Sequence, residues 1–288
     1  MTEIWKGATV AAALNEKTRT QCEKLKERGI CPTLAIVRVG EREDDLSYER
    51  GVKKRCEAVG VAVRRYVLDA AASQEELLAV IEGINADDTV HGCLLFRPLP
   101  RHLDEAAICA ALDSGKDVDG ITEESLAGVF TGSGVGFPPC TAQAVVEILD
   151  HYGVDLTGKR VTVVGRSLVV GKPAAMLLDR RNATVTLCNS RTKNLPELCR
   201  QGEVLVVAMG KRGAIGADCF RPGQIVIDVG IHVGEEGKLC GDVRTEEAKG
   251  IVAAITPVPG GVGAVTTAVL VSHVVRSAQR HSDPEENV

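Results

Sequence analysis

A chain of 288 residues is long enough for about two domains of ordinary size. Apolar residues make up 44 % of it but aromatic residues only 3 %, so Val, Leu, Ile and Ala must fill the cores. The formal net charge of −5, without a dense Lys/Arg block, argues against a nucleic-acid partner and against a membrane surface. We see no secretory signal, and prolines and glycines interrupt the apolar tract 251–271, so we expect no membrane span.

The ten cysteines form no C-x-x-C pair and show no His/Cys spacing typical of a metal site. They are scattered as small apolar residues would be, Cys56 on an expected helix and Cys93 in an expected strand. We therefore expect no metal and a reduced, cytoplasmic protein. A set of disulfides in an exported protein is the alternative.

Strand and helix patterns alternate through the first half of the chain. We expect helices at 8–28, 46–59 and 73–85, and strands at 33–39, 61–68 and 90–95. Ser73 and Glu76 have the spacing of a capping box at the start of the third helix. This alternation predicts parallel βαβ units and an α/β fold.

A second domain is expected after the Gly- and Pro-rich segment 131–139, our linker candidate. Helices at 141–151, 172–180 and 195–200 alternate there with strands at 160–164, 183–187, 204–208 and 224–229. These elements predict a Rossmann-like domain. A terminal helix at 266–280 is expected to pack back on the first domain. The predicted domains are residues 1–138 with 266–288, and residues 139–265.

The segment Val161–Pro173 has the pattern of a buried parallel strand, a tight turn and the start of a helix. Gly165 can adopt turn angles that other residues avoid, and free N–H groups at a helix start favour an anion. A dinucleotide pyrophosphate fits this description. The spacing departs from G-x-G-x-x-G, so an ordinary strand-to-helix turn is the alternative.

A Rossmann site for NAD normally has an acidic residue at the end of its second strand. The corresponding strand here, 183–188, is followed by Asn189-Ser190-Arg191-Thr192 and no carboxylate. Ser190, Arg191 and Arg166 could instead bind a 2′-phosphate through charge-assisted hydrogen bonds. We therefore favour NADP, with NAD possible, although Arg191 could also be a solvated surface charge.

Two further segments have unusual composition. Lys116–Gly120 places two carboxylates in one loop, and Thr256–Gly263 is a Pro-rich segment that ends in glycines after an expected strand. Loops at the carboxyl ends of strands are where open α/β sheets bind ligands. Each segment alone would more often be a turn.

Together, these segments resemble the methylenetetrahydrofolate dehydrogenase/cyclohydrolase (FolD) family. The matching pieces follow the family's order over nearly the whole chain: Tyr48, Lys116–Gly120, Pro139–Thr141, Val164–Pro173, Ala183–Thr192, Val226–Ile231, Gly241–Val243 and Thr256–Gly263. The resemblance implies two α/β domains with a folate cleft between them, usually in a homodimer. It implies oxidation of methylenetetrahydrofolate with NADP, then hydrolysis of the methenyl product to formyltetrahydrofolate.

The resemblance also assigns residues to the ligands. The implied cofactor contacts are Gly165, Arg166, Ser167, Ser190 and Ile231. Asp119 is implied to accept hydrogen bonds from the pterin end of the folate. Tyr48 is implied to stack or hydrogen-bond in the same cleft, with Pro259, Gly260 and Gly261 as part of its wall.

The sequence departs from the family at two positions of the hydrolytic site. The family has a Lys four residues after the Tyr, where this chain has Val52, and a Gln where it has Phe96. Residues i and i+4 share a helix face, so Val52 would project beside Tyr48, whereas Lys53 and Lys54 point about 100° and 200° away. Neither Val52 nor Phe96 can transfer a proton. Our hypothesis is a dehydrogenase that has lost most of its cyclohydrolase activity.

Several alternatives stay open at this point. Val52 could be a core valine that never meets substrate. Arg97, beside Phe96, could serve as a replacement group in a fully bifunctional enzyme, could recruit a different acidic ligand, or could be a solvated rim residue. A catalytically silent paralogue that binds folate or nucleotide is the alternative from a different functional class.

Overall fold

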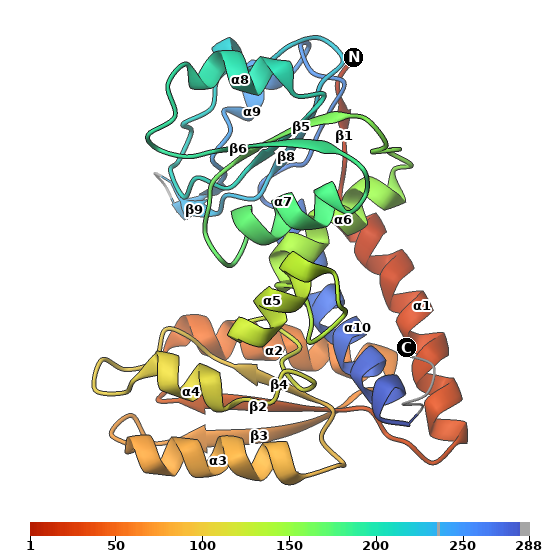
Figure 1. Cartoon of the computed structure of the whole chain (residues 1–288), viewed down its shortest axis with the longest axis vertical. Coiled ribbons are helices and arrows are strands. Elements are labelled where there is room, and N and C mark those ends of the chain that lie inside the picture. Colours follow the sequence, from red (N-terminus) through yellow and green to blue (C-terminus); the bar gives the residue numbers. More distant parts are fainter. Residues whose placement is uncertain (235–236, 283–288) are drawn as a thin grey trace. The chain divides into compact units, whose positions relative to one another are not determined.

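The computed structural model describes residues 1–234 and 237–282, and the chain folds into two compact units (Figure 1). Unit 1 comprises residues 1–12 and 141–266, and unit 2 comprises residues 13–140 and the residues from 267 onward. The chain passes between the units within helix α1 (Gly7–Glu27), near the start of α6 (Cys140–His151) and within α10 (Val262–Ser282).

Unit 1 is built on a six-stranded sheet in which every neighbouring pair is parallel. The strand order is β6 (Thr184–Cys188), β5 (Arg160–Val164), β7 (Val204–Val207), β8 (Ile225–Asp228), β11 (Ala254–Ile255) and β1 (Glu3–Ile4). Without β1, this is the doubly wound order 2-1-3-4-5. The chain turns to opposite sides of β5 to form β6 and then β7, so the carboxyl ends of β5 and β7 flank the topological switch point.

Helices cover both faces of this sheet (Figure 1). On one face lie α8 (Leu195–Gln201), the short 3-10 helix η1 (Ala217–Cys219) and α9 (Thr245–Ala248). Their apolar residues form one core with Val164, Leu205, Val207, Val226 and Ile255 of the strands. On the other face lie α6 and α7 (Gly171–Asp179). A hairpin of β9 (His232–Val233) and β10 (Leu239–Cys240) completes the unit.

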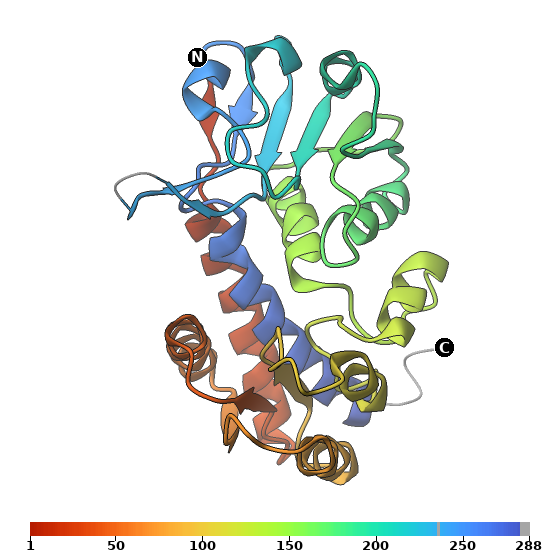
Figure 2. The same cartoon turned by 90° about the vertical axis from the view of Figure 1, so that its left-hand side faces the viewer.

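Unit 2 has a three-stranded parallel sheet in the order β3 (Ala62–Leu68), β2 (Thr33–Val39) and β4 (Gly92–Leu95). The crossovers are α2 (Glu43–Val59) and α3 (Gln74–Ala86), which Figure 2 shows near the foot of the cartoon. Beyond β4, the backbone of 116–118 continues the parallel pattern, with Cys93 N–H donating to the Lys116 carbonyl at 2.7 Å. The chain forms β3 on one side of β2 and then β4 on the other side, so the carboxyl ends of β2 and β4 flank a second switch point.

The core of unit 2 lies between the sheet and two helices. Val37 and Leu95 of the strands pack with Leu77 and Ile81 of α3 and with Ile108 of α4 (Glu105–Ala111). The opposite face of the sheet receives α10, because Val274 lies against Gly92. The terminal helix thus packs on unit 2, as predicted. A further helix, α5 (Glu123–Thr131), follows the 113–120 loop.

The structure corrects two predicted boundaries. Residues 1–12 lie in unit 1 and not with the first domain, because β1 pairs with β11 across some 250 residues of sequence. The linker candidate 131–139 is instead a packed loop of unit 2, in which Phe137 is fully buried. The predicted βαβ alternation and the Rossmann-like order are confirmed.

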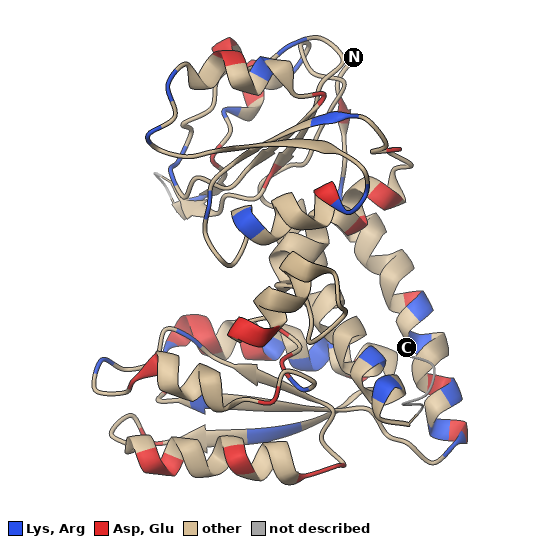
Figure 3. Cartoon of the chain, viewed as in Figure 1, with Lys and Arg blue, Asp and Glu red and all other residues tan. Residues whose placement is uncertain are grey.

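Charged residues of both signs are interspersed along the second half of α1 (Figure 3). Of the helices within 1–234 and 237–282, none is long and apolar enough to cross a membrane. All ten cysteines are unpaired. Over the same residues, no group of three or more His, Cys, Asp or Glu is arranged to hold a metal ion.

Candidate functional site

The first set of predicted residues lies at the switch point of unit 1. Gly165 follows β5 with φ +132°, and a Cβ atom there would lie 2.1 Å from the Ala208 carbonyl oxygen at the end of β7. A Cβ atom at Gly171 would lie 2.0 Å from the Gly165 carbonyl oxygen. Only glycine fits at either position, so the turn closes tightly and α7 begins directly beneath it.

The turn presents the predicted cofactor residues to solvent. Arg166 and Ser167 are exposed, and so are the apolar Leu168 and Val169 that follow. Ser167 Oγ accepts the Val170 N–H at 3.1 Å, which holds the turn from inside. The arrangement places an exposed serine and an exposed arginine just before the start of a nine-residue helix. Such a surface suits an anion.

The loop after β6 leaves from the same edge of the sheet, because Val164 and Cys188 are in register. Asn189 organises this loop: its side-chain oxygen accepts the Arg191 N–H at 2.9 Å, and its own N–H donates to Thr192 Oγ1 at 2.8 Å. Ser190 and Arg191 are exposed on this turn. The structure therefore brings Ser190 and Arg191 to the same edge as Arg166.

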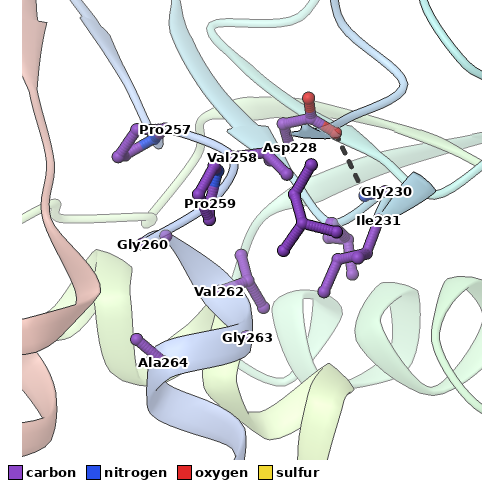
Figure 4. Close-up of a pocket in the computed structure, with 13 residues that line it drawn as sticks. Asp228, Gly230, Ile231, Pro257, Val258, Pro259, Gly260, Val262, Gly263 and Ala264 are labelled. Carbon is purple, nitrogen blue, oxygen red and sulfur yellow. Dashed lines mark hydrogen bonds between the residues drawn. The ribbon is translucent and has the colours of Figure 1, made fainter. Parts of the chain in front are cut away.

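A pocket of about 310 Å³ lies at the carboxyl ends of β8 and β11 (Figure 4). Its wall contains Ile231 and the predicted residues Pro259, Gly260 and Gly261. Ile231 is 58 % exposed and reaches the first turn of α10, where a Cβ atom at Gly263 would lie 3.1 Å from its Cδ1. The resemblance assigned Ile231 to the cofactor and Pro259–Gly261 to the folate, and the structure brings them to one pocket.

Asp228 lines this pocket and is itself 1 % exposed. Its carboxylate accepts the N–H groups of Gly230 at 3.0 Å, Asp242 at 3.1 Å and Val243 at 3.0 Å. Burial nevertheless raises the pKa of Asp228 to about 6. Asp228 thus anchors the loops beside the pocket.

The second set of predicted residues lies in unit 2, at the carboxyl edge of its sheet. Tyr48 is in the second turn of α2, which follows β2, and Phe96 directly follows β4. The ring centroids of Tyr48 and Phe96 are 5.8 Å apart, with 68° between the planes. Asp119 leaves the same edge, since 116–118 runs parallel beside β4. The three side chains thus converge at the switch point between β2 and β4.

Asp119 and Tyr48 share one environment. Burial raises the pKa of Asp119 to about 6, although a hydrogen bond with the Cys140 thiol and the positive charge of Arg97 act in the opposite direction. Tyr48 is 40 % exposed, yet protein crowds its hydroxyl end, and this burial together with the charge of Asp119 raises the pKa of the phenol. Tyr48 also hydrogen-bonds to the side chain of Thr267 on α10.

The other two residues of the 116–120 motif have structural roles. Lys116 Nζ donates to the carbonyls of Ile84, Asn85 and Asp87 at 2.7–2.9 Å and thereby caps the end of α3. The Asp117 carboxylate accepts two N–H groups before α5 and the Ser125 hydroxyl at 2.7 Å. Of the two carboxylates in this loop, only that of Asp119 is partly accessible.

Val52 lies on α2 and has no exposed surface. Lys53 and Lys54 are exposed. Phe96 is 7 % exposed. Among Tyr48, Val52, Phe96 and Asp119, only Tyr48 and Asp119 are more than slightly accessible. Full burial of Val52 also fits the alternative of a core residue.

Arg97 is half-buried beside this set. Its guanidinium lies 3.5 Å from Glu105 Oε1, a long contact, and its side chain is 28 % exposed. Its positive charge lowers the pKa of Asp119. Arg97 is thus close enough to influence Asp119 and remains partly accessible.

Three polar side chains near these sets, those of Cys140, Thr267 and His232, were not among the predicted site residues. Cys140 and Thr267 contact Asp119 and Tyr48, and His232 contacts the buried Asp242. Cys140 and Asp242 belong to segments that carried the resemblance, which was the available signal. Nothing in the local pattern around Thr267 or His232 indicated a contact.

Two family models match the chain in succession. The tetrahydrofolate dehydrogenase/cyclohydrolase catalytic domain matches residues 5–119, and the NAD(P)-binding domain of the same family matches residues 139–282. The bifunctional protein FolD of Carboxydothermus hydrogenoformans is 49 % identical over 97 % of this chain and 98 % of its own length. This chain belongs to the tetrahydrofolate dehydrogenase/cyclohydrolase family. The FolD protein of Clostridioides difficile is 48 % identical over 96 % of both chains.

Solved structures of the tetrahydrofolate dehydrogenase/cyclohydrolase family have the same fold. The bifunctional FolD enzyme of Campylobacter jejuni matches with a TM-score of 0.94 and 38 % identity, over 97 % of this chain and 99 % of that one. The Trypanosoma brucei FolD, solved with NADP and an inhibitor, matches with a TM-score of 0.89 and 32 % identity, over 97 % and 98 % of the two chains. The α/β fold and the membership of this enzyme family are therefore established.

Proposed function

We propose that the chain oxidises methylenetetrahydrofolate to methenyltetrahydrofolate with NADP and hydrolyses the methenyl product only slowly. The slow hydrolysis is supported by two apolar residues: Phe96, whose ring packs against Tyr48, and the buried Val52, one helical turn after Tyr48 on α2. In the family pattern, a Lys and a Gln occupy these two positions. The oxidation with NADP is supported by two separate sets of residues: the set in unit 1 suits the cofactor, and the set in unit 2 suits the folate.

The residues of unit 1 would hold NADP, which supplies the hydride acceptor when bound. Gly165, Arg166 and Ser167 would contact the pyrophosphate and its neighbouring groups at the turn. Ser190 and Arg191 would bind the 2′-phosphate through charge-assisted hydrogen bonds. Ile231 would contact the cofactor beside the pocket at the start of α10.

The residues of unit 2 would align the folate. The ring of Tyr48 offers a flat, partly exposed surface to the substrate, and the Asp119 carboxylate can accept hydrogen bonds from pterin N–H groups. Pro259, Gly260 and Gly261 are proposed as a further wall for the same ligand. The nitrogen lone pair of the substrate stabilises the cation that remains after hydride loss. The oxidation therefore needs alignment and exclusion of water more than a protein acid or base.

Hydrolysis of the methenyl cation has a different requirement. Water adds to the methenyl carbon, which forms a C–O bond and releases a proton that a nearby group must accept. One of the two C–N bonds at that carbon then breaks and leaves the formyl group on the other nitrogen. General acid–base help of this kind contributes about 10²–10⁴-fold. Val52 and Phe96 cannot accept or donate a proton, so we expect hydrolysis to be slower by a factor of this order.

The test measures both steps separately on the purified protein, from the absorbance of reduced cofactor and then the decay of methenyl absorbance. The double reversion Val52→Lys with Phe96→Gln should restore hydrolysis, and each single reversion should restore less. Lys53→Gln is the matched control, because Lys53 is exposed away from this set. Wild-type hydrolysis as fast as oxidation would contradict the proposal.

A second candidate is the fully bifunctional enzyme, favoured by 49 % identity to a protein named bifunctional and by the partly accessible Asp119, whose raised pKa suits a proton acceptor. The ratio of the two wild-type rates decides between the candidates. Tight binding of NADP and folate without any oxidation would instead indicate a silent paralogue.

We also propose a cytoplasmic homodimer. The cytoplasm is supported by ten unpaired cysteines, which suit a reducing compartment. The dimer rests on the resemblance to the family. Sedimentation of the purified protein at several concentrations tests the dimer, and a monomer mass throughout would contradict it.

A further inference from the structure

The buried carboxylate of Asp242 joins two loops of unit 1. Its Oδ2 accepts the N–H groups of Met209 at 2.6 Å and Gly210 at 3.0 Å. Its Oδ1 accepts the Lys211 N–H at 2.8 Å and lies 2.7 Å from Nε2 of His232. Asp242 is fully buried, so these contacts replace water entirely. Three of the four partners belong to the loop after β7, and the fourth belongs to β9.

The loop after β7 is fixed against the glycine turn. The Ala208 N–H donates to the Val164 carbonyl at 2.7 Å, directly before Gly165. A Cβ atom at Gly165 would lie 2.1 Å from the Ala208 carbonyl oxygen, so the two backbones touch. The position of the Asp242 carboxylate is therefore set relative to the turn proposed to hold the cofactor.

His232 links the Asp242 carboxylate to the pocket. It directly follows Ile231, which lines the pocket and is 58 % exposed. The His232 side chain is 23 % exposed, and its Nε2 must carry the proton of this hydrogen bond because a carboxylate only accepts. The strand pair between His232 and Cys240 also places Leu239 at the same pocket.

Closely packed backbone fixes the position of the Asp242 carboxylate. A Cβ atom at Gly230 would lie 2.5 Å from Cγ of Asp242. The Asp242 N–H is held by Asp228, and a Cβ atom at Gly241 would lie 1.9 Å from the Asp228 carboxylate. The position of Asp242 is thus fixed. The imidazole of His232 connects the segment that carries Ile231 to Asp242 through their hydrogen bond.

We infer that His232 is a positioning residue for the cofactor: its hydrogen bond to Asp242 holds Ile231 at a set distance from the glycine turn. This inference rests on the proposed function, in which NADP contacts both the turn and Ile231. His232 itself need not touch the cofactor. Its loss should weaken binding of the cofactor without changing the chemistry of a correctly bound complex.

The experiment compares His232→Ala with wild type by direct titration with NADP, without folate, and by steady-state kinetics. One lost hydrogen bond corresponds to a factor of about 2–12 in an equilibrium constant. We expect the Kd and KM for NADP to rise by about that factor. We expect kcat at saturating NADP and the KM for methylenetetrahydrofolate to change less than about twofold.

Two variants separate positioning from a general structural effect. His232→Gln keeps an N–H donor at similar reach and should restore most of the affinity for NADP. Val233→Ala, at the next position of β9, changes a side chain that is 72 % exposed and should leave binding unchanged.

The possible results distinguish failure of the role inferred for His232 from failure of the proposed function. If His232→Ala binds NADP as tightly as wild type, the inference is overturned. If His232→Gln fails to restore affinity, the hydrogen bond is not the cause. If wild-type protein does not bind NADP at all, the proposed function fails first.

Discussion

The rings of Phe96 and Tyr48 form an edge-to-face pair, with the ring centroids 5.8 Å apart and 68° between the ring planes. Such an edge-to-face pair is worth about 0.5–1.5 kcal/mol beyond its buried area. Phe96 is nearly buried and its N–H donates to the Val37 carbonyl at 2.9 Å, whereas Tyr48 is 40 % exposed. Phe96 therefore acts as a fixed support that restricts the more accessible ring.

Removing this support should weaken folate binding. Phe96→Leu keeps an apolar residue but loses the aromatic ring, so we expect the KM for methylenetetrahydrofolate to rise about 2–10-fold. The KM for NADP, bound by residues of unit 1, should not change. Steady-state kinetics with each substrate varied in turn measure both values. An unchanged KM for folate would show that Tyr48 is held by other contacts.

The raised pKa of Asp119, about 6, predicts a pH dependence of catalysis. Only the charged carboxylate accepts hydrogen bonds from pterin N–H groups at both oxygens, so kcat/KM for the folate should fall about tenfold per pH unit below 6. Asp119→Asn should remove this dependence and lower kcat/KM at pH 7.5 by about 10–100-fold. A pH profile of kcat/KM for both proteins tests this, and a profile that persists in the variant would contradict it.

The same residue predicts a change in stability. Because burial raises the folded pKa above the ordinary value of 3.8, the folded chain binds more protons here between pH 3.8 and about 6. The contribution of Asp119 to the unfolding free energy therefore falls as pH rises through this window, and the charged form is a cost at pH 7. We expect Asp119→Asn to raise the unfolding free energy by about 1–2 kcal/mol at pH 7, after allowance for partial exposure. Urea unfolding should show the gap closing towards pH 4.

A buried ion pair anchors the helix that carries Tyr48. Arg38 of β2 and Glu49 of α2 lie 3.2 Å apart with side-chain exposures of 1 % and 5 %, and Arg65 also pairs with Glu49. Glu49→Gln would leave the Arg38 charge buried without its partner, which typically costs about 3–5 kcal/mol. Urea unfolding followed by circular dichroism measures this. In the control Glu246→Gln, the broken pair with Lys249 is exposed, so the change should stay within about 1 kcal/mol.

Local patterns predicted much of this fold. The strand 33–39 was predicted with its observed bounds, because a short run of apolar and β-branched residues is bounded by turn residues. The capping box of Ser73 and Glu76 is confirmed, with both hydrogen bonds present. The Gly165 turn could also be predicted, because its strand, glycine and helix are consecutive in the sequence.

The missed features depend on contacts between distant segments. The two-residue strand β1 exists only because it pairs with β11, and nothing in Glu3-Ile4 alone indicates this. The pairing of His232 with Asp242 requires a hairpin to close between them. Arg38 interrupts an apolar strand, which was a visible signal of a buried partner, but the pattern could not identify Glu49.

The glycine turn offers a direct steric test. Gly165→Ala would place a Cβ atom 2.1 Å from the Ala208 carbonyl oxygen, at a φ of +132° that other residues rarely adopt, so the turn must move. We expect the Kd for NADP to rise more than about tenfold. Gly158→Ala is the control, since its φ is also positive but no atom lies within 4 Å of the added Cβ. Equal affinities in the two variants would show that the turn does not contact NADP.

The choice between NADP and NAD can be tested at Arg191. The side chain is exposed on a turn that Asn189 stabilises, so Arg191→Ala should leave the loop folded. Losing a charge-assisted hydrogen bond to a 2′-phosphate costs about 1.5–3 kcal/mol, so the KM for NADP should rise about 10–100-fold. The KM for NAD should hardly change, because NAD lacks this phosphate. Lys193→Ala removes an exposed charge beyond the turn and serves as the control. Equal effects of Arg191→Ala on both cofactors would mean that Arg191 supports the loop without contacting the 2′-phosphate.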